Sequence, residues 1–167
     1  MKKIVVIFFI TIVSTQCFSS GIYKSFSINT NINKNNFFSN TAKILLSDNY
    51  LTLNFDGKTG AFFSKKITMS IKTDIPNSSN INKYKIIMSD NESSCYDIDD
   101  NIVFDDISIV SIDGHKLDKY DELSFSEFNN ESDYKESTHN LDISFKKLPS
   151  SVYKCKGSSL FTMEFDI

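Results

Sequence analysis

The sequence predicts an all-β protein, and three observations support this prediction. Short segments in which apolar and polar residues alternate recur from residue 22 to the end of the chain, as in strands with one buried face. Turn-forming pairs such as Asp56-Gly57 and Asp113-Gly114 separate these segments. No segment of the chain after residue 20 shows a helical period of useful length. Together the lengths and spacings favour an antiparallel β-sandwich.

The N-terminal residues 1–19 are predicted to be a secretory signal peptide. Lys2 and Lys3 precede a ten-residue apolar run, and small polar residues follow it. The run is too short to span a membrane, which takes about 20 apolar residues. Cleavage is expected after Ser19 or after Cys17, and lipidation of Cys17 is disfavoured because Gln16 precedes it. About 145 residues remain, which is the size of one domain with a real core.

The first predicted strand lies at the start of the mature chain, within residues 22–33. Polar serine and asparagine residues occupy one face of this stretch. The other face is formed by Ile22, Phe26, Ile28, Thr30 and Ile32. The alternation alone leaves open whether this apolar face enters the core of its own domain or that of another molecule.

The later strands follow one another with polar turns between them. The segments predicted as strands are 42–46, 50–55, 65–73, 84–89, 106–112, 122–128, 140–145 and 159–167. Each is rich in isoleucine, leucine, phenylalanine or tyrosine and alternates with serine, threonine or charged residues. Residues 76–79 and 129–137 are predicted to be turns or loops because they are rich in Asn, Ser, Asp or Pro.

The charge of the mature chain argues against nucleic acid as a partner. Removal of residues 1–19 takes away two lysines and leaves 16 basic against 21 acidic residues, a net charge near −5. The basic residues are all lysines and are scattered among acidic ones. Binding to nucleic acid requires a clustered basic surface, which this pattern does not provide.

Two cysteines remain after signal cleavage, Cys95 and Cys155. In an exported protein the simple expectation is one intramolecular disulfide between them. The alternative is two separate buried thiols. A disulfide would join the loop after residues 84–90 to the approach of the final strand.

The titratable residues do not assemble into a predicted active site. His115 lies in a turn-like DGHK sequence and His139 at the start of a polar loop, so both are expected to be solvated. We therefore predict that the protein is not an enzyme and needs no cofactor. The acidic stretch has three alternating oxygen donors, Asp97, Asp99 and Asn101, but lacks the glycine and the glutamate of a calcium loop. We interpret it as a solvated loop and leave calcium binding open.

The two ends of the mature chain resemble those of chaperone–usher fimbrial subunits, or pilins. Residues 146–167 contain Leu148-Pro149 and then Tyr153, and they end in an alternating strand whose apolar face is formed by Phe161, Met163, Phe165 and Ile167. Residues 26–38 look like the donor segment of colonisation-factor pilins of the alpha-fimbrial kind. The similarity extends loosely over the mature chain. The pair Cys95 and Cys155 is a departure from the major pilins of this kind.

This resemblance implies an incomplete immunoglobulin-like antiparallel β-sandwich with an N-terminal donor strand. Residues 20–35 would be the donor segment and residues 36–167 the pilin domain. The final strand would border a groove left open by a missing strand, so an isolated subunit would be unstable and prone to aggregate. The resemblance also implies identical or related fimbrial subunits, a periplasmic chaperone and an outer-membrane usher as partners, with a possible host-cell receptor.

The donor interpretation makes a specific expectation for a lone subunit. Residues 20 to about 33 would project from the domain or lie loosely against it, because their apolar face would be made for a neighbour's groove. The alternative is that they form the first strand of their own domain. A second functional class also remains, a secreted β-sandwich that acts alone as a binding module or an inhibitor.

Overall fold

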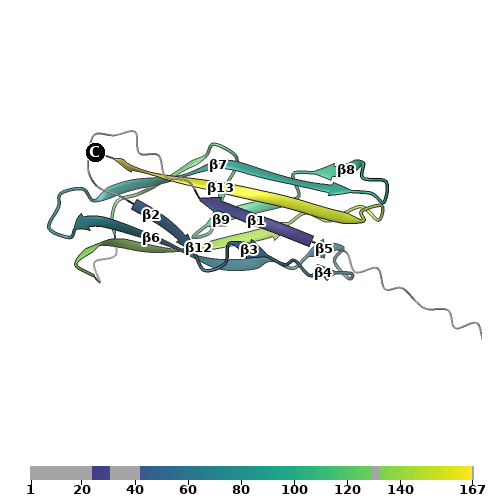
Figure 1. The fold of residues 1–167 in the computed structure, drawn as a ribbon, viewed down its shortest axis with the longest axis horizontal. Helices are drawn as coiled ribbons and strands as arrows, with labels where there is room; N and C mark the ends of the chain where they lie inside the picture. The colour runs from purple at the N-terminus through teal and green to yellow at the C-terminus, as the bar shows by residue number, and fades with distance from the viewer. Residues whose placement is uncertain (1–23, 31–41, 129–131, 167) are drawn as a thin grey trace, which may run out of the picture.

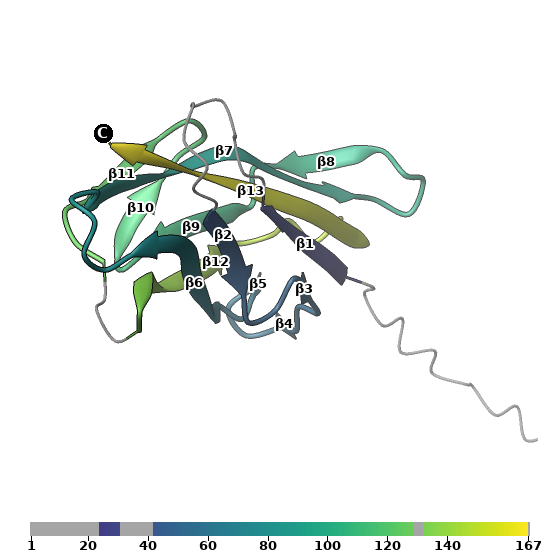
Figure 2. The ribbon, with the colours of Figure 1, turned by 60° about the vertical axis from the view of Figure 1, so that its left-hand side comes forward.

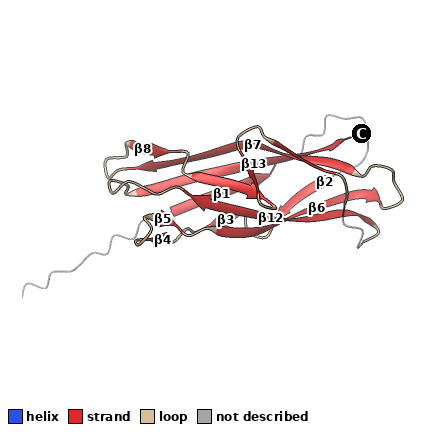
Figure 3. Cartoon of the chain, turned by 180° about the vertical axis from the view of Figure 1, so that it is seen from behind, coloured by secondary structure: helices blue, strands red, loops and turns tan. Residues whose placement is uncertain are grey.

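The computed structural model describes residues 24–30, 42–128 and 132–166, and in this part of the chain it is a sandwich of two β-sheets (Figures 1 and 2). The predicted signal peptide and the flanks of the predicted donor segment lie outside the described residues. Figure 3 shows strands and loops and no helix among the described residues. No helix in these ranges is therefore long and apolar enough to cross a membrane. The predicted all-β, immunoglobulin-like sandwich is confirmed.

The first sheet has the strand order β11-β7-β13-β1-β3, and β8 pairs with β7 beyond the end of β11. Its strands are β1 (Lys24–Thr30), β3 (Tyr50–Leu51), β7 (Lys83–Tyr96), β8 (Ile102–Asp105), β11 (Glu122–Phe125) and β13 (Lys154–Asp166). The second sheet has the order β10-β9-β12-β6-β2. Its strands are β2 (Ala42–Leu46), β6 (Lys65–Pro76), β9 (Ser108–Ile112), β10 (His115–Leu117) and β12 (Tyr134–Phe145). A small hairpin is formed by β4 (Phe55–Asp56) and β5 (Ala61–Phe62).

Four long strands, β6, β7, β12 and β13, form the framework of the sandwich. Their inward side chains form a continuous apolar core that includes Met69, Ile86, Leu141 and Phe161, each 0% exposed. Burial of each such side chain stabilises the fold by about 1.5–3 kcal/mol. The alternation seen in the sequence is thus the alternation between the core and the outer faces of the sheets.

The Asp113-Gly114 pair forms the predicted hairpin turn between β9 and β10. Both residues have positive φ, 51° and 83°, and the flanking Ile112 and His115 are paired. A two-residue turn with positive φ at both positions matches the right-handed twist of the strands that it joins. The Asp-Gly sequence is suited to this turn because these residues tolerate such a backbone.

Several strand boundaries differ from the prediction. The predicted strand 50–55 is divided between β3 and β4, and β7 and β12 extend well beyond their predicted limits. The extra residues of β7 and β12 include the inward-facing, buried Ser93, Lys135, Ser137 and His139. Because these inward positions are polar, the hydrophobic alternation that identifies a strand is absent there.

Candidate functional site

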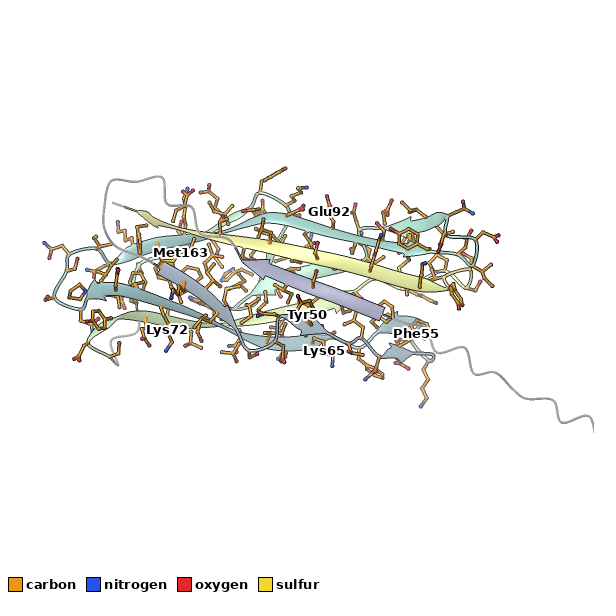
Figure 4. The ribbon with its side chains drawn as sticks, in the orientation of Figure 1. Tyr50, Phe55, Lys65, Lys72, Glu92 and Met163 are labelled. Carbon is orange, nitrogen blue, oxygen red and sulfur yellow. A yellow bond between two sulfur atoms is a disulfide. The ribbon has the colours of Figure 1, made fainter. Side chains whose placement is uncertain are left out.

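The N-terminal strand β1 lies between β13 and β3, in a position that we call the β1 seat (Figure 1). It runs parallel to β13, with register from Lys24 opposite Cys155 to Thr30 opposite Phe161. On its other side it pairs with β3 at two positions, Phe26 opposite Leu51 and Ser27 opposite Tyr50. The Ile28 N–H donates a hydrogen bond of 3.0 Å to the Asn49 carbonyl oxygen. Figure 4 labels Tyr50 beside this strand.

Ile28, the described apolar side chain of β1, enters the core of its own domain. Ile28 is 3% exposed and belongs to the main core cluster. The expectation that this segment projects from a lone subunit or lies loosely against it is therefore wrong for residues 24–30, because they pair with β13 and β3 of the same chain. Ile22 and Ile32 lie outside the described residues, and Thr30 is placed by its backbone register opposite Phe161.

The final strand β13 contributes the predicted apolar face. Phe161 and Met163 are buried, and Phe165 is partly buried against Phe128, with ring centroids 6.5 Å apart. Ile167 lies outside the described residues. The expected exposed edge is wrong for residues 155–161, because β13 is paired there with β7 on one side and β1 on the other. From Thr162 to Asp166 its pairing within the described chain is with β7 alone.

The disulfide Cys95–Cys155 is present, with an S–S distance of 2.08 Å, and both residues are buried. Cys95 lies within β7 rather than in a loop, and it is directly opposite Cys155 on β13. Cys155 is also the residue opposite Lys24, the first residue of β1. The disulfide therefore joins β7 to β13 at the end of the β1 seat where the N-terminal strand begins.

A chain of hydrogen bonds, buried at Tyr84 and His139, links the two sheets. The Tyr84 hydroxyl of β7 lies 2.7 Å from Nε2 of His139 on β12, and His139 Nδ1 lies 2.6 Å from Asp113 Oδ2. His139 is 6% exposed, so the prediction that it is solvated is wrong. His115 is exposed on β10, as predicted. The rings of Phe125 and Phe128 pack against Tyr84.

The order hydroxyl, imidazole and carboxylate is that of a nucleophile with its base and orienting acid, but the chemistry does not fit. Tyr84 is 1% exposed, and burial is the main cause that raises its pKa to about 12. A tyrosine that resists ionisation and lies inside the core cannot attack a substrate near neutral pH. We interpret Tyr84, His139 and Asp113 as a structural link across the sandwich.

This link predicts a specific acid sensitivity. Burial alone would raise the pKa of Asp113, but hydrogen bonds from the Asn140 N–H and from His139 outweigh it and lower that pKa. A carboxyl with a lowered pKa in the folded state stabilises the fold above its unfolded pKa, and this stability is lost as the pH falls through the folded value. The variant Asp113→Asn is expected to lose less stability than the wild type between pH 5 and pH 2. Urea unfolding at a series of pH values measures this, and parallel profiles for the two proteins would contradict it.

The acidic stretch around Asp97 forms a turn in which the Asp97 carboxylate accepts hydrogen bonds from neighbouring residues. Asp97 Oδ1 accepts hydrogen bonds of 2.9 Å from the Asp99 and Asn101 N–H groups, and Asp97 Oδ2 accepts one from the Asn101 side chain. These bonds, that from the Asn101 N–H first, lower the pKa of Asp97. Asp100 pairs with Lys154 on β13. No group of metal-ligating side chains occurs in residues 24–30, 42–128 and 132–166.

Comparisons with known proteins find a similarity to solved structures. No protein-family model matches the chain, and no curated protein matches it. Among the solved structures that match is the CooA pilin subunit from enterotoxigenic Escherichia coli, with a TM-score of 0.49 and 14% sequence identity. The match covers 74% of this chain and 96% of that chain. The expected resemblance to a fimbrial pilin is found, and at this identity it concerns the fold alone.

Proposed function

We propose that the chain is a structural or adhesive subunit of a surface fimbria, in which subunits are joined by exchange of the N-terminal strand. The observation that supports this is the β1 seat, filled by a strand that is joined to the rest of its domain through residues 31–41. A second copy can supply the same strand, because the contacts inside the seat are then unchanged. Such head-to-tail exchange produces an open filament when it does not close into a ring.

The direction of β1 sets it apart from the rest of the sandwich. Its pairing with β13 is parallel, whereas the other pairings among the described strands are antiparallel. Main-chain hydrogen bonds along an open strand, with alternate side chains entering the core, are the basis of recognition by strand addition. In this protein Ile28 is the described side chain that enters the core in this way.

Exchange has to compete with the strand of the same chain. A strand that belongs to the same chain as its seat has an effective concentration in the millimolar range, so at micromolar subunit concentrations the closed monomer is favoured about 1,000-fold. This advantage corresponds to about 4 kcal/mol. Assembly therefore needs a partner that holds the seat open and a site where the next subunit replaces it. A periplasmic chaperone and an outer-membrane usher would supply these functions after export through the signal peptide.

A second candidate function is a secreted β-sandwich that acts alone as a binding module or an inhibitor. The filled β1 seat favours this alternative too, because the described core is closed without a partner. The expected instability and aggregation of an isolated subunit followed from an open groove, and the chain's own β1 fills that position. In both cases the purified chain is therefore expected to be a soluble monomer at micromolar concentration. The alternatives differ in whether β1 ever leaves its own seat.

A cross-link between β1 and β13 tests the exchange. Ser27 lies opposite Ser158 in the parallel register, so cysteines at these two positions are placed to form a disulfide within one chain. The double variant Ser27→Cys/Ser158→Cys is expected to remain monomeric in cells that make the chaperone and the usher. Mild reduction of this exposed bond is expected to restore fibres, which are scored by electron microscopy.

The single variant Ser27→Cys is the matched control and is expected to assemble in both conditions. Fibres formed by the oxidised double variant, with the cross-link verified by mass spectrometry, would overturn strand exchange. If the wild type forms no fibres with any chaperone and usher, the solitary binding module is the better function.

A further inference from the structure

A shallow hollow of about 460 Å³ lies on the outer face of the first sheet, where β7, β13 and β1 run side by side. Its outward-facing lining consists of Ser27, Glu92, Ser94, Tyr96, Lys156 and Ser158. The register brings these residues together, with Ser27 opposite Ser158, Ser158 opposite Glu92 and Lys156 opposite Ser94. We call this site the serine hollow. Figure 4 labels Glu92 on β7.

The floor of the hollow is made of small hydroxyl side chains. Alternation along β7 turns Ser93 and Cys95 into the interior and Ser94 outward. Within the described chain the hydroxyls of Ser27, Ser94 and Ser158 have no side-chain hydrogen-bond partner. Each hydroxyl can donate one hydrogen bond and accept two. The floor therefore offers several unused donors and acceptors in a small area.

The rim adds an aromatic ring and charged side chains of both signs. Two lysines lie over the Tyr96 ring, with Lys156 Nζ 4.9 Å and Lys154 Nζ 5.8 Å from its centroid, so a molecule that contacts this ring is also within reach of both ammonium groups. Glu92 lies on the other side of the floor, and its carboxylate is 3.9 Å from Lys119 Nζ. Lys119 also pairs with Asp90 at 2.6 Å, and Lys154 pairs with Asp100. The lysines around the hollow are thus matched by carboxylates, which disfavours a strongly anionic or cationic ligand.

We propose that the serine hollow binds a neutral saccharide. A sugar ring presents C–H groups on one face, which pack against an aromatic ring, and hydroxyls at its edge, which both donate and accept hydrogen bonds. Tyr96 contacts the ring face, the three serines bond the hydroxyls, and Lys156 and Glu92 bond further hydroxyls as donor and acceptor. A few directed polar groups beside an aromatic surface are typical of small-molecule sites.

Strand β1 completes this site because it supplies Ser27. A chain with an empty β1 seat lacks one wall of the hollow, whereas a closed monomer or a subunit that has received a neighbour's strand has it. This part of the inference rests on the proposed function. A shallow hollow gives weak affinity, in the millimolar range, which repetition along a fibre would raise by avidity.

The test uses the closed monomer of the secreted chain and so does not depend on fibre formation. Titration followed by NMR, with neutral di- and trisaccharides of galactose, glucose and N-acetylhexosamines to about 10 mM, covers the expected affinity range. At least one saccharide is expected to bind, with shifts at the amides of the hollow. The variant Tyr96→Ala removes the aromatic ring, and Ser158→Leu fills the floor of the hollow. Each is expected to weaken binding about tenfold or more.

Tyr120→Ala is the matched control. Tyr120 is an exposed tyrosine that, like the half-buried Tyr96, has a lysine over its ring, Lys119 at 5.4 Å, but it lies outside the serine hollow. This variant is expected to bind like the wild type. Each of three outcomes would overturn the proposal. These are retained binding in Tyr96→Ala, binding of sialylated saccharides alone, and no binding of any neutral saccharide. Saccharide binding by a protein that never forms fibres would support the hollow and reject only the fimbrial function.

Discussion

A chain in which both Cys95 and Cys155 are replaced by alanine is expected to lose about 4 kcal/mol of its free energy of unfolding. The disulfide joins residues 60 apart in the sequence, and the chain-entropy model gives an effect of this size for such a loop. The loss is large because a domain of this size is stable by only about 5–15 kcal/mol in total. Urea unfolding of the variant and of the wild type measures the difference.

The position of the disulfide adds a local effect to the global one. Because Cys155 is paired with both Cys95 and Lys24, the disulfide holds β13 in place at the start of the β1 seat. Amide exchange at Ile28 is therefore expected to become faster in the double variant than in the wild type under native conditions. Wild type in a reducing agent, unfolded in the same way, is the control and is expected to match the variant. Two free thiols in the oxidised wild type, or a variant as stable as the wild type, would contradict both expectations.

The apolar strands were predictable from the sequence because their inward positions are apolar. In β6 the buried Ile67, Met69 and Ile71 alternate with polar residues, and the predicted strand and the observed one begin at the same residue. The Asp113-Gly114 turn was predictable for a local reason, since few residue pairs tolerate positive φ at two successive positions.

The polar interior was not predictable in the same way. His139 occupies an inward position of β12, and its hydrogen-bond partners are Tyr84, 55 residues away, and Asp113, 26 residues away. The second half of β7 similarly turns Asn91 inward, where its Oδ1 accepts hydrogen bonds from Ser108 and Ser159. Polar residues are tolerated inside a core when their partners are present. These partners come from distant strands and are not visible in the local sequence. The local pattern of polar residues therefore predicts a loop where the structure has a strand.

The candidate site was predictable in its residues but not in its arrangement. The alternation of β1 indicates a strand with one buried face, and Ile28 is buried in the structure. The sequence contains no information on whether the groove that receives it belongs to the same copy, because the contacts are identical in both cases. The serine hollow was not predicted, since it arises from the register between β1, β13 and β7.

The substitution Ile28→Asp is expected to expel β1 from its seat. Ile28 is 3% exposed, and an unpaired carboxylate in that position costs several kcal/mol. This penalty is the same whether the strand comes from its own chain or from a neighbour, so fibre formation is expected to be abolished. The matched control is Ser27→Asp, because Ser27 is the next residue on the same strand but faces outward at the serine hollow. This control is expected to keep β1 seated and to form fibres.

Co-expression with the chaperone separates a donated strand from a purely resident one. If β1 is exchangeable, the chaperone's strand fills the β1 seat in place of the altered segment, and the Ile28→Asp subunit is expected to fold and to be recovered as a chaperone complex. Recovery of this complex together with the absence of fibres is the predicted outcome, measured by affinity purification and electron microscopy. If Ile28→Asp prevents folding even with the chaperone while Ser27→Asp folds, the strand is an obligatory part of its own sandwich. In that case the solitary binding module becomes the better interpretation, because β1 could not be donated to a neighbouring subunit.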